Sequence, residues 1–355
     1  MPRVSVLIPH HRSVKLLEPL FASLFAMDMD PRRVEYVLVD NGATDGSVEF
    51  VRRRFPAVKI FALGRNEGFA PALNRAARVY ESRWLCFLNN DVRVEVDWLS
   101  NLLHAARQID APCFASHLMD WKGKRTQFGG GWINLFGKGF ESTGIQEEQP
   151  YEIFFACGCG MMIRRDVFLD AGGFDDDYFM IYEDVDLGWR LRLLGHKIYL
   201  APDAKIMHKG HASLDQIPYR QKALYFERNS LATIYKNLSD ESLSAVLPLA
   251  LREAALRAKG AAGQGLPFRY SGDGLAILEA VQAFWDRLPV WQKKRASIQA
   301  KRTVSDAELF QRFFPNPDQL WAFNAEQYKR LHHPRLLPHI KGALEEAARA
   351  VGTAR

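Results

Sequence analysis

Strand-like and helix-like patterns alternate through about the first ninety residues, and this alternation restricts the fold more than any other feature of the chain. Apolar, β-branched runs that read as buried strands occupy residues 4–8, 35–39, 58–61 and 84–88. Apolar residues at helical spacing separate them, at residues 16–25, around 48–51 and at 70–80. Strands that alternate with helices favour right-handed crossovers, so we expect an α/β fold with a mostly parallel sheet and helices on both faces.

Polar residues gather where three of these strands end. They form the clusters PHH at 9–11, DNG at 40–42 and NND at 89–91. Because ligands of open α/β sheets bind in the crevice at the carboxyl ends of the strands, we expect the three clusters to converge on one pocket. An acid flanked by amides, as Asp91 is, can hold a hard divalent cation, and His208 is a candidate second ligand. The alternative is an ordinary turn, which Asn and Asp often form.

An acidic, aromatic segment at residues 174–190 carries six carboxylates. If a helix begins near Glu183, then Glu183, Asp186 and Arg190 share one face, and Asp184 points about 100° away from it. Asp184 is then placed to face a cleft, in the first helical turn, where the helix dipole favours a carboxylate. The alternative is a structural cluster that begins a helix and pairs with Arg190.

Composition limits the class of protein. The chain has 355 residues, 48% hydrophobic and 25% charged, which is typical of a globular protein. The formal net charge of +6 is a modest excess, and together with acidic and amidic strand ends it argues against a nucleic-acid binder. We expect a cytoplasmic protein, because no apolar run approaches the roughly 20 residues of a membrane span and no signal-peptide pattern opens the chain.

The four cysteines lack the spacing of a zinc site. Cys157 and Cys159 flank a glycine, and we expect them to pack in the structure, with a metal or redox pair as the alternative. Residues 114–151 are rich in glycine and are expected to form loops and edge strands over a site. Residues 153–163 are apolar and contain Gly158 and Gly160, where the backbone can approach a ligand closely.

The composition changes after about residue 212. We therefore expect one domain at residues 1–212 and a helical region at 213–355, in which strand signals are nearly absent. A basic run in this region, formed by Lys293, Lys294 and Arg295 with Lys301 and Arg302, lies near Trp285 and Trp291. Such a combination of aromatic and basic residues is typical of helices on an anionic membrane surface, and a solvated helix face is the alternative.

Six motifs in a fixed order are similar to those of a known family. They are VSVLIP at 4–9, VDNGATDGS at 39–47, NEGFAPALN at 66–74, LNND at 88–91, GGFD at 172–175 and EDVDL at 183–187. Over residues 3–235 the chain resembles the inverting family 2 glycosyltransferases of the GT-A fold, in particular the bacterial rhamnosyltransferase-like branch. The resemblance implies a Rossmann-like GT-A domain with a nucleotide-sugar half at about 1–110 and an acceptor half at about 111–212.

The resemblance also implies roles for individual residues. The nucleotide sugar would be bound by Pro9, His10, Asp40, Arg65, Asn66, Gly68, Phe69, Asn74, Asn89 and Asn90. Asp91 and His208 would hold Mg²⁺ or Mn²⁺, and Asp184 would be the general base. Acceptor-binding or supporting roles fall to Glu183, Asp186, Asp175, Trp189 and Arg228. Two departures from the family pattern are Asn89, which stands where the family has an acid, and the run His10, His11, Arg12.

The implied function is a metal-dependent inverting glycosyltransferase. It would take a dTDP- or UDP-sugar, with dTDP-rhamnose among the candidates, and extend a cell-surface glycan or its lipid-linked precursor at the inner face of the membrane. A metal neutralises the leaving diphosphate and a base takes the proton of the acceptor hydroxyl. The alternatives are a sugar nucleotidyltransferase, which would need a glycine-rich loop after the first strand, and a non-catalytic module that binds nucleotide sugars.

Overall fold

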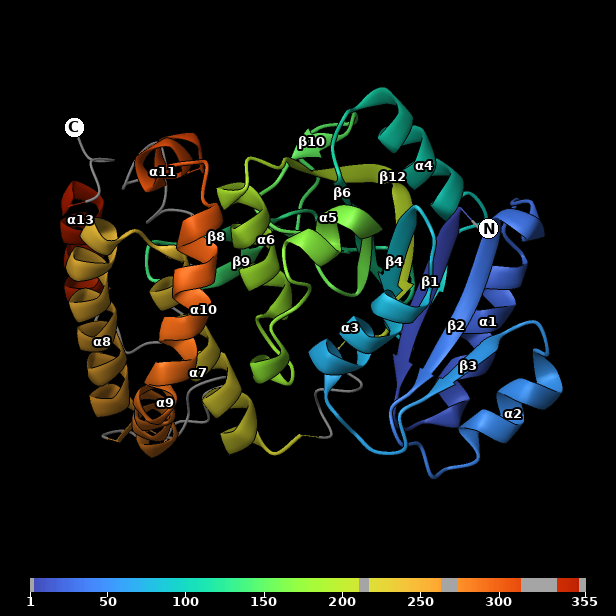
Figure 1. Ribbon diagram of the computed structural model, residues 1–355, viewed down its shortest axis with the longest axis horizontal. Helices are drawn as coiled ribbons and strands as arrows, with labels where there is room; N and C mark the ends of the chain where they lie inside the picture. The colour runs from blue at the N-terminus through green and yellow to red at the C-terminus, as the bar shows by residue number, and fades with distance from the viewer. Residues whose placement is uncertain (1–2, 211–216, 263–273, 314–336, 351–355) are drawn as a thin grey trace. The chain divides into compact units, whose positions relative to one another are not determined.

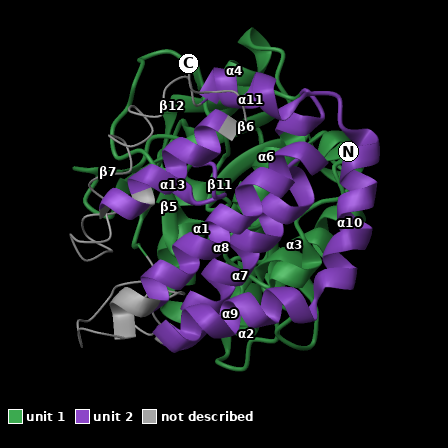
Figure 2. Cartoon of the chain, turned by 90° about the vertical axis from the view of Figure 1, so that its left-hand side faces the viewer, with its two compact units in different colours: residues 1–131, 141–191, 196–213 green, residues 132–140, 192–195, 214–355 purple. Residues whose placement is uncertain are grey.

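The computed structural model describes residues 3–210, 217–262, 274–313 and 337–350. Contacts divide the chain into two compact units, shown in two colours in Figure 2. The first unit comprises residues 1–131, 141–191 and 196–213, and the second comprises 132–140, 192–195 and 214–355. The second unit therefore includes two short segments that we had assigned to the first domain.

The first unit is built on a twisted sheet whose N-terminal half is parallel, as predicted (Figure 1). Its strands are β1 (Val4–His10), β2 (Val34–Asp40), β3 (Lys59–Ala62) and β4 (Trp84–Leu88), in the spatial order β3, β2, β1, β4. The connecting helices are α1 (Leu17–Phe25), α2 (Ser47–Arg54) and α3 (Phe69–Val79). Successive strands are added toward one edge of the sheet from β1 to β3, and β4 is then added on the other side of β1. Right-handed crossovers therefore put α1 and α2 on one face of the sheet and α3 on the other.

The rest of the sheet is mixed. Next to β4 lie, in order, β11 (Gly160–Arg164), β6 (Cys113–Asp120), β12 (Ile198–His208) and β10 (Tyr151–Glu152), while β5 (Val92–Val94) pairs with β12 and β7 (Thr126–Phe128) pairs with β6. Strands β8 (Gly131–Ile133) and β9 (Gly139–Glu141) form a separate pair. The helices here are α4 (Trp98–Gln108), α5 (Arg165–Asp170) and α6 (Glu183–Leu193). Short 3-10 turns lie at η1 (Val14–Leu16), η2 (Pro31–Arg33) and η3 (Asp176–Tyr178).

Strand β6 corrects our reading of residues 114–151 as loops and edge strands, because it lies inside the sheet between β11 and β12. Its apolar pattern is interrupted by Ser116 and His117, which are both buried. Each is satisfied internally: the indole of Trp98 donates to Ser116 Oγ (2.8 Å), and His117 bonds the Pro202 carbonyl (3.2 Å) and Thr126 Oγ1 (2.9 Å). Buried polar groups with such partners are compatible with a central strand.

Gly160 packs closely against β12, and the approach of a ligand to it stays a prediction. A Cβ at this position would lie 2.7 Å from Ile206 Cδ1 of β12, so a side chain there would force the Ile206 side chain to shift. Beneath the same sheet, the rings of Phe87, Phe168 and Phe174 pack in tilted and edge-on geometries with centroids 4.9–5.2 Å apart. Phe174 thereby anchors the start of the acidic segment in the core.

The second unit is helical, as predicted. Its helices are α7 (Tyr219–Asn237), α8 (Asp240–Ala262), α9 (Gly274–Asp286), α10 (Leu288–Lys301), α11 (Asp306–Phe313) and α13 (Leu337–Ala350). A buried ion network joins its elements: Glu227 accepts from Lys138 Nζ (2.7 Å) and from both terminal nitrogens of Arg257 (2.5 and 2.6 Å). Burial alone would raise the pKa of Glu227, but these cations outweigh burial and lower that pKa to about 2.

Part of the basic run of α10 holds the end of α7 in place. Arg295 is buried and donates to the carbonyls of Tyr235 and Leu238 (both 2.5 Å), and Gln299 donates to the Lys236 carbonyl (2.8 Å). The last carbonyls of a helix have no partner within the helix, so these side chains supply the missing donors. Arg295 is therefore not available to a membrane surface, which corrects that part of our reading of the basic run.

We expect Arg295→Met to lower the free energy of unfolding by about 2–4 kcal/mol, because it removes a charged donor and leaves buried carbonyls unpaired. Chemical denaturation measures the loss. Lys293→Met, on the exposed side of the same helix, is the matched control and should change stability by less than about 0.5 kcal/mol. Equal effects of the two substitutions would contradict the capping role.

Candidate functional site

The carboxyl ends of β1 and β4 meet where the strand order reverses, which is where α/β sheets bind their ligands. His10 joins the two ends: its Nδ1 lies 2.8 Å from Asn90 Nδ2, and its Nε2 lies 2.7 Å from Ser47 Oγ. Burial lowers the pKa of His10 to about 4. The predicted donor-binding residues His10 and Asn90 are thus brought together, with their polar atoms bonded to protein.

A second polar cluster forms the neighbouring wall. Asn41 follows β2 and donates to Asn66 Oδ1 (3.1 Å) and to the Gly68 carbonyl (2.9 Å), while its own Oδ1 accepts from the Glu67 amide (2.8 Å). Gly68 has φ +95°, and a Cβ there would lie 2.5 Å from the Phe179 carbonyl. Only glycine tolerates this combination of backbone conformation and close approach.

The remaining predicted donor residues lie on these same elements. Pro9 and Asp40 are half-buried at the ends of β1 and β2, and Asp40 Oδ1 accepts from the Ala43 amide (2.8 Å). Arg65 is the most available cation of this wall, since 82% of its side chain is exposed. Phe69 begins α3, and Asn89 is half-buried after β4, with its amide bonded to the Cys159 carbonyl (3.2 Å).

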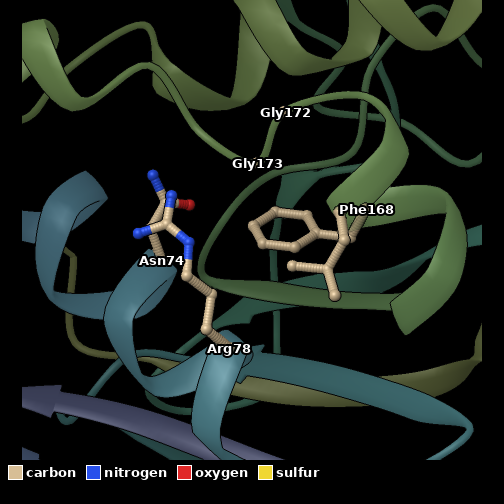
Figure 3. Close-up of a pocket in the computed structure, with 6 residues that line it drawn as sticks. Asn74, Arg78, Phe168, Gly172 and Gly173 are labelled. Atoms are coloured by element: carbon tan, nitrogen blue, oxygen red, sulfur yellow. The ribbon is translucent and has the colours of Figure 1, made fainter.

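Asn74 was predicted to face the nucleotide, but its amide is bonded internally. It donates to the Phe174 carbonyl (2.8 Å) and to Asp176 (2.6 Å), and it accepts from the Phe174 amide (2.9 Å). A small pocket of about 60 Å³ beside it is lined by Asn74 and Arg78 of α3, by Phe168 and Leu169 of α5, and by the glycine turn that follows (Figure 3). This volume is far below the roughly 300 Å³ or more of a ligand site, so the pocket is not the nucleotide site.

Asp91 and His208 come together as predicted. Asp91 Oδ1 lies 3.4 Å from His208 Nε2, and no hydrogen-bond donor among the described residues is better placed for this buried oxygen. Gln127 Oε1 holds the other ring nitrogen at 2.9 Å. Burial alone would lower the pKa of His208, but the sulfur of Cys159 and the carboxylate of Asp91 raise it to about 11.

The Asp91–His208 pair is a candidate site for a divalent cation. A carboxylate oxygen and an imidazole that converge, with the imidazole oriented by a second partner, are a suitable donor set for Mn²⁺ or, less well, for Mg²⁺, provided that the cation displaces the proton that the raised pKa keeps on His208. No group of three or more His, Cys, Asp or Glu side chains in the described parts of the chain is arranged to hold a metal ion. A cation held here would therefore need oxygen ligands from outside the protein.

Helix α6 begins at Glu183, as the spacing of the acidic segment predicts. Asp184 is half-exposed and accepts from the Gly158 amide (3.0 Å) and the Val185 amide (2.8 Å), while Glu183 is buried and its Oε2 has no hydrogen-bond partner among the described residues. Burial, and then the charge of Asp184, raise the pKa of Glu183 to about 8. Burial also raises the pKa of Asp184, against the two amides that lower it.

The segment from Cys157 to Cys159 connects this helix to the Asp91–His208 pair. The Gly158 amide bonds Asp184 (3.0 Å), and the Cys159 sulfur interacts electrostatically with the His208 imidazole. All four cysteines are free thiols. Three consecutive residues therefore hold the predicted base and the predicted metal ligand in one site.

The other acidic-segment residues are structural. Asp186 is fully buried and pairs with Arg190 one turn later (2.8 Å), which is the helix-completing role that we weighed for the cluster. Asp175 accepts from the Asp177 amide (2.9 Å), and Trp189 packs edge-on against Phe154.

Arg228 belongs to α7 of the second unit, where it donates to Asn229 (3.0 Å), and a role with the acceptor stays a prediction.

Glu141 belongs to the site but was not predicted. It lies at the end of β9, and its carboxyl interacts electrostatically with Asp184 and His208. Although Glu141 keeps access to solvent, the protein atoms around it and the charge of Asp184 raise its pKa to about 7. A lone acid in a glycine-rich stretch gives no periodic signal, so only the folded arrangement reveals it.

No helix among the described residues is both long enough and apolar enough to cross a membrane.

The sequence was compared with protein families and with individual proteins. The family model described as glycosyl transferase family 2 matches residues 5–172. The N-acetylglucosaminyl-diphospho-decaprenol L-rhamnosyltransferase of Mycobacterium tuberculosis is 30% identical over 226 residues, which cover 56% of this chain and 73% of that protein. The dTDP-rhamnosyl transferase RfbF of Shigella flexneri is 25% identical over 211 residues, 58% of this chain and 68% of that protein.

Solved structures share the fold. They include GalNAc-T7 with UDP, GalNAc and Mn²⁺ (TM-score 0.58, 15% identity, 93% of this chain and 58% of that chain) and S. aureus TarS 1–349 (TM-score 0.53, 14% identity, 98% of this chain and 89% of that chain). At these identities the likeness concerns the fold alone, which is the GT-A fold with added C-terminal helices. The family model matches residues 5–172, and the 30% identical rhamnosyltransferase is matched over 73% of its length. The chain therefore belongs to glycosyl transferase family 2.

Proposed function

We propose that this glycosyltransferase moves a sugar, with inversion, from a nucleotide diphosphate sugar to a hydroxyl group of a cell-surface glycan or its lipid-linked precursor. The observation that carries the proposal is the segment of residues 157–159, in which the Gly158 amide bonds Asp184 and Cys159 interacts electrostatically with His208. A base beside a metal-binding pair is the arrangement that such a transfer needs.

Asp184 has the geometry of the general base. It lies in the first turn of α6, it is half-exposed, and two amides hold its carboxylate in one orientation. Glu183 next to it keeps a proton at neutral pH, because burial and the charge of Asp184 raise its pKa to about 8. Of the two adjacent carboxyl groups, Asp184 is the one that reaches solvent, and the two amides that it accepts from favour its ionised form against the burial that raises its pKa.

Asp91 and His208 would hold the cation. When bound, Mg²⁺ or Mn²⁺ would neutralise the diphosphate leaving group as a Lewis acid. The chain's own contribution is to hold Asp91 buried, to orient His208 through Gln127, and to leave the rest of the coordination shell to diphosphate oxygens. This division is consistent with Asn89, a neutral residue, in the family's acidic position.

The donor that we favour is dTDP-rhamnose. One similar protein is named a dTDP-rhamnosyl transferase and another an L-rhamnosyltransferase that acts on N-acetylglucosaminyl-diphospho-decaprenol. A lipid-linked sugar is accordingly the acceptor class to test first. Thermal stabilisation of the protein across a panel of nucleotide sugars tests the donor, since a ligand that binds only the folded state raises the melting temperature.

Asp184→Asn should lower kcat about 10²–10⁴-fold, because the amide cannot take the proton of the acceptor hydroxyl. Donor affinity should stay within about threefold, which titration calorimetry measures. Asp166→Asn, an exposed acid on α5, is the matched control and should leave both values unchanged. Unchanged turnover in the Asp184 variant would remove this residue as the base.

Asp91→Asn should raise the Mn²⁺ concentration for half-maximal transfer on the order of tenfold or more, because the amide is a weaker ligand than a carboxylate. A chelator should abolish transfer by the wild-type protein, and added Mn²⁺ should restore it. Asp97→Asn, an exposed acid at the start of α4, is the control. Identical metal titrations for both variants would exclude Asp91 as a ligand.

Glu183→Gln should make the protein less sensitive to pH. The folded state holds a proton on Glu183 up to about pH 8, whereas the unfolded chain loses it near the usual value of 4.5, so wild-type stability falls as the pH rises from 4.5 to 8. Relative to wild type, the variant should therefore gain at least about 1 kcal/mol between pH 5 and pH 8.

Denaturant unfolding at the two pH values measures this gain. In the wild-type protein the pKa of Asp166 lies below its usual value of 3.8, because Arg164 bonds its carboxylate, so the stability difference between the Asp166→Asn control and wild type should be the same at pH 5 and pH 8. A parallel pH dependence of wild type and Glu183→Gln would show that Glu183 is ionised in the folded protein.

A further inference from the structure

Three strand ends of the first unit bring an aromatic ring and several cations to one place. In the sheet, Arg93 of β5 lies opposite Met207 of β12, and Met207 lies beside Met119 of β6. Side chains two residues apart on a strand point to the same face, so Lys209 and Trp121 follow Met207 and Met119 on the face of Arg93. His208 alternates to the other face.

Contacts confirm this convergence on Trp121. The Arg93 guanidinium lies 5.0 Å from the centre of the Trp121 ring and donates to the Trp121 carbonyl (3.0 Å), and Lys209 Nζ lies 5.2 Å from the same ring. Cation–π attraction holds each cation, but it brings two like charges to one ring. Arg93 Nε is buried and has no acceptor among the described residues.

The turn that begins with Trp121, residues 121–125, adds three exposed cations, and we call it the basic turn. These are Lys122, Lys124 and Arg125. The neighbouring Asp120 is engaged locally: its carboxylate accepts from the Lys124 amide (2.8 Å) and from Arg125 Nε (3.2 Å). Five cations thus gather near one engaged carboxylate and a half-buried indole, which leaves a strong excess of positive charge.

We infer that the basic turn, with Arg93 and Lys209, is a docking surface for a bilayer that carries anionic lipids. Tryptophan is enriched at the membrane–water interface, and clustered Lys and Arg residues attract acidic headgroups. The positive charge of this surface complements that of such a bilayer. The other candidate, the basic run of α10, loses Arg295 to the α7 carbonyls and is the weaker surface.

The donor diphosphate is the other source of phosphate that could occupy these cations. The side-chain alternation of β12 argues against it, because His208 and Lys209 point to opposite faces, and His208 is the residue that contacts Asp91. The inference goes beyond the proposed function and does not depend on the transfer reaction. It would place the enzyme where a lipid-linked acceptor is found.

The test is cosedimentation of the full chain, without donor or metal, with vesicles of phosphatidylcholine alone or mixed with phosphatidylglycerol. The wild-type protein should bind the mixed vesicles and not the neutral ones. The triple variant K122A/K124A/R125A should bind them on the order of 100-fold more weakly, at about fivefold for each basic residue. Trp121→Ala should weaken binding about tenfold.

The triple variant R52A/R53A/R54A is the matched control, because it removes three exposed cations from α2 and gives the same net charge. It should lose no more than about threefold in binding. Equal losses in both triple variants would assign binding to overall charge, and absence of binding by the wild-type protein would refute the surface outright. If K122A/K124A/R125A instead loses affinity for the nucleotide sugar, the cations serve the donor and the inference is wrong.

Discussion

The rest of the site depends on the hydrogen bond between Asn90 and His10. It ties the end of β4 to the end of β1, where the strand order reverses and the two crossover directions separate. Because Asn90 Nδ2 can only donate, His10 Nδ1 accepts, and the proton on Nε2 is directed to Ser47 Oγ. A neutral imidazole is required for this arrangement, and the burial that lowers the pKa of His10 provides it. Polar contacts of His10 with Asn90 and Ser47 thus join the ends of β1 and β4 to the start of α2.

Much of the fold follows from the sequence, because apolar periodicity is strong where strands are buried on both faces. Residues 84–88 are a continuous apolar run and form β4 as predicted. The interior strand β6 was missed for a physical reason: Ser116 and His117 look like loop residues until Trp98, Pro202 and Thr126 supply their partners from distant parts of the chain. Periodicity cannot report a hydrogen bond that spans many residues.

The candidate site, like the fold, could be predicted from the sequence only in part. Motif residues next to strand ends, such as Asp91, are placed by the topology and can be located from the sequence. Residues whose role comes from packing cannot be located in this way, and Asn74 and Glu141 are two examples. Asn74 lies in a motif, but its side-chain amide is hydrogen-bonded to the backbone of Phe174. Glu141 lies in no motif, but its carboxyl interacts electrostatically with Asp184 and His208.

Glu183 and Asp184, the two acids at the start of α6, follow a loop with strained backbone. Phe179, Ile181 and Tyr182 all have positive φ, at 59°, 68° and 79°, which is unfavourable for bulky and β-branched residues. Phe179 is fixed in turn, because its carbonyl accepts from the Phe69 amide (2.6 Å) where Gly68 leaves room for it. The loop therefore delivers Glu183 inward and Asp184 outward at the first turn of the helix.

Basic residues of this chain have two different roles, and the sequence alone does not show which residues have which role. The basic run of α10 and the basic turn at residues 121–125 have similar composition, and each lies near tryptophan. Their roles differ because of the acceptors within reach: the end of α7 offers unpaired carbonyls to Arg295, whereas Asp120 is the carboxylate beside the basic turn and is already engaged. A cation that completes a helix end stabilises the fold, whereas exposed cations such as Lys122 and Lys124 keep their attraction for an external anion. The number of internal acceptors, more than the number of basic residues, decides which surface of this chain can meet a membrane.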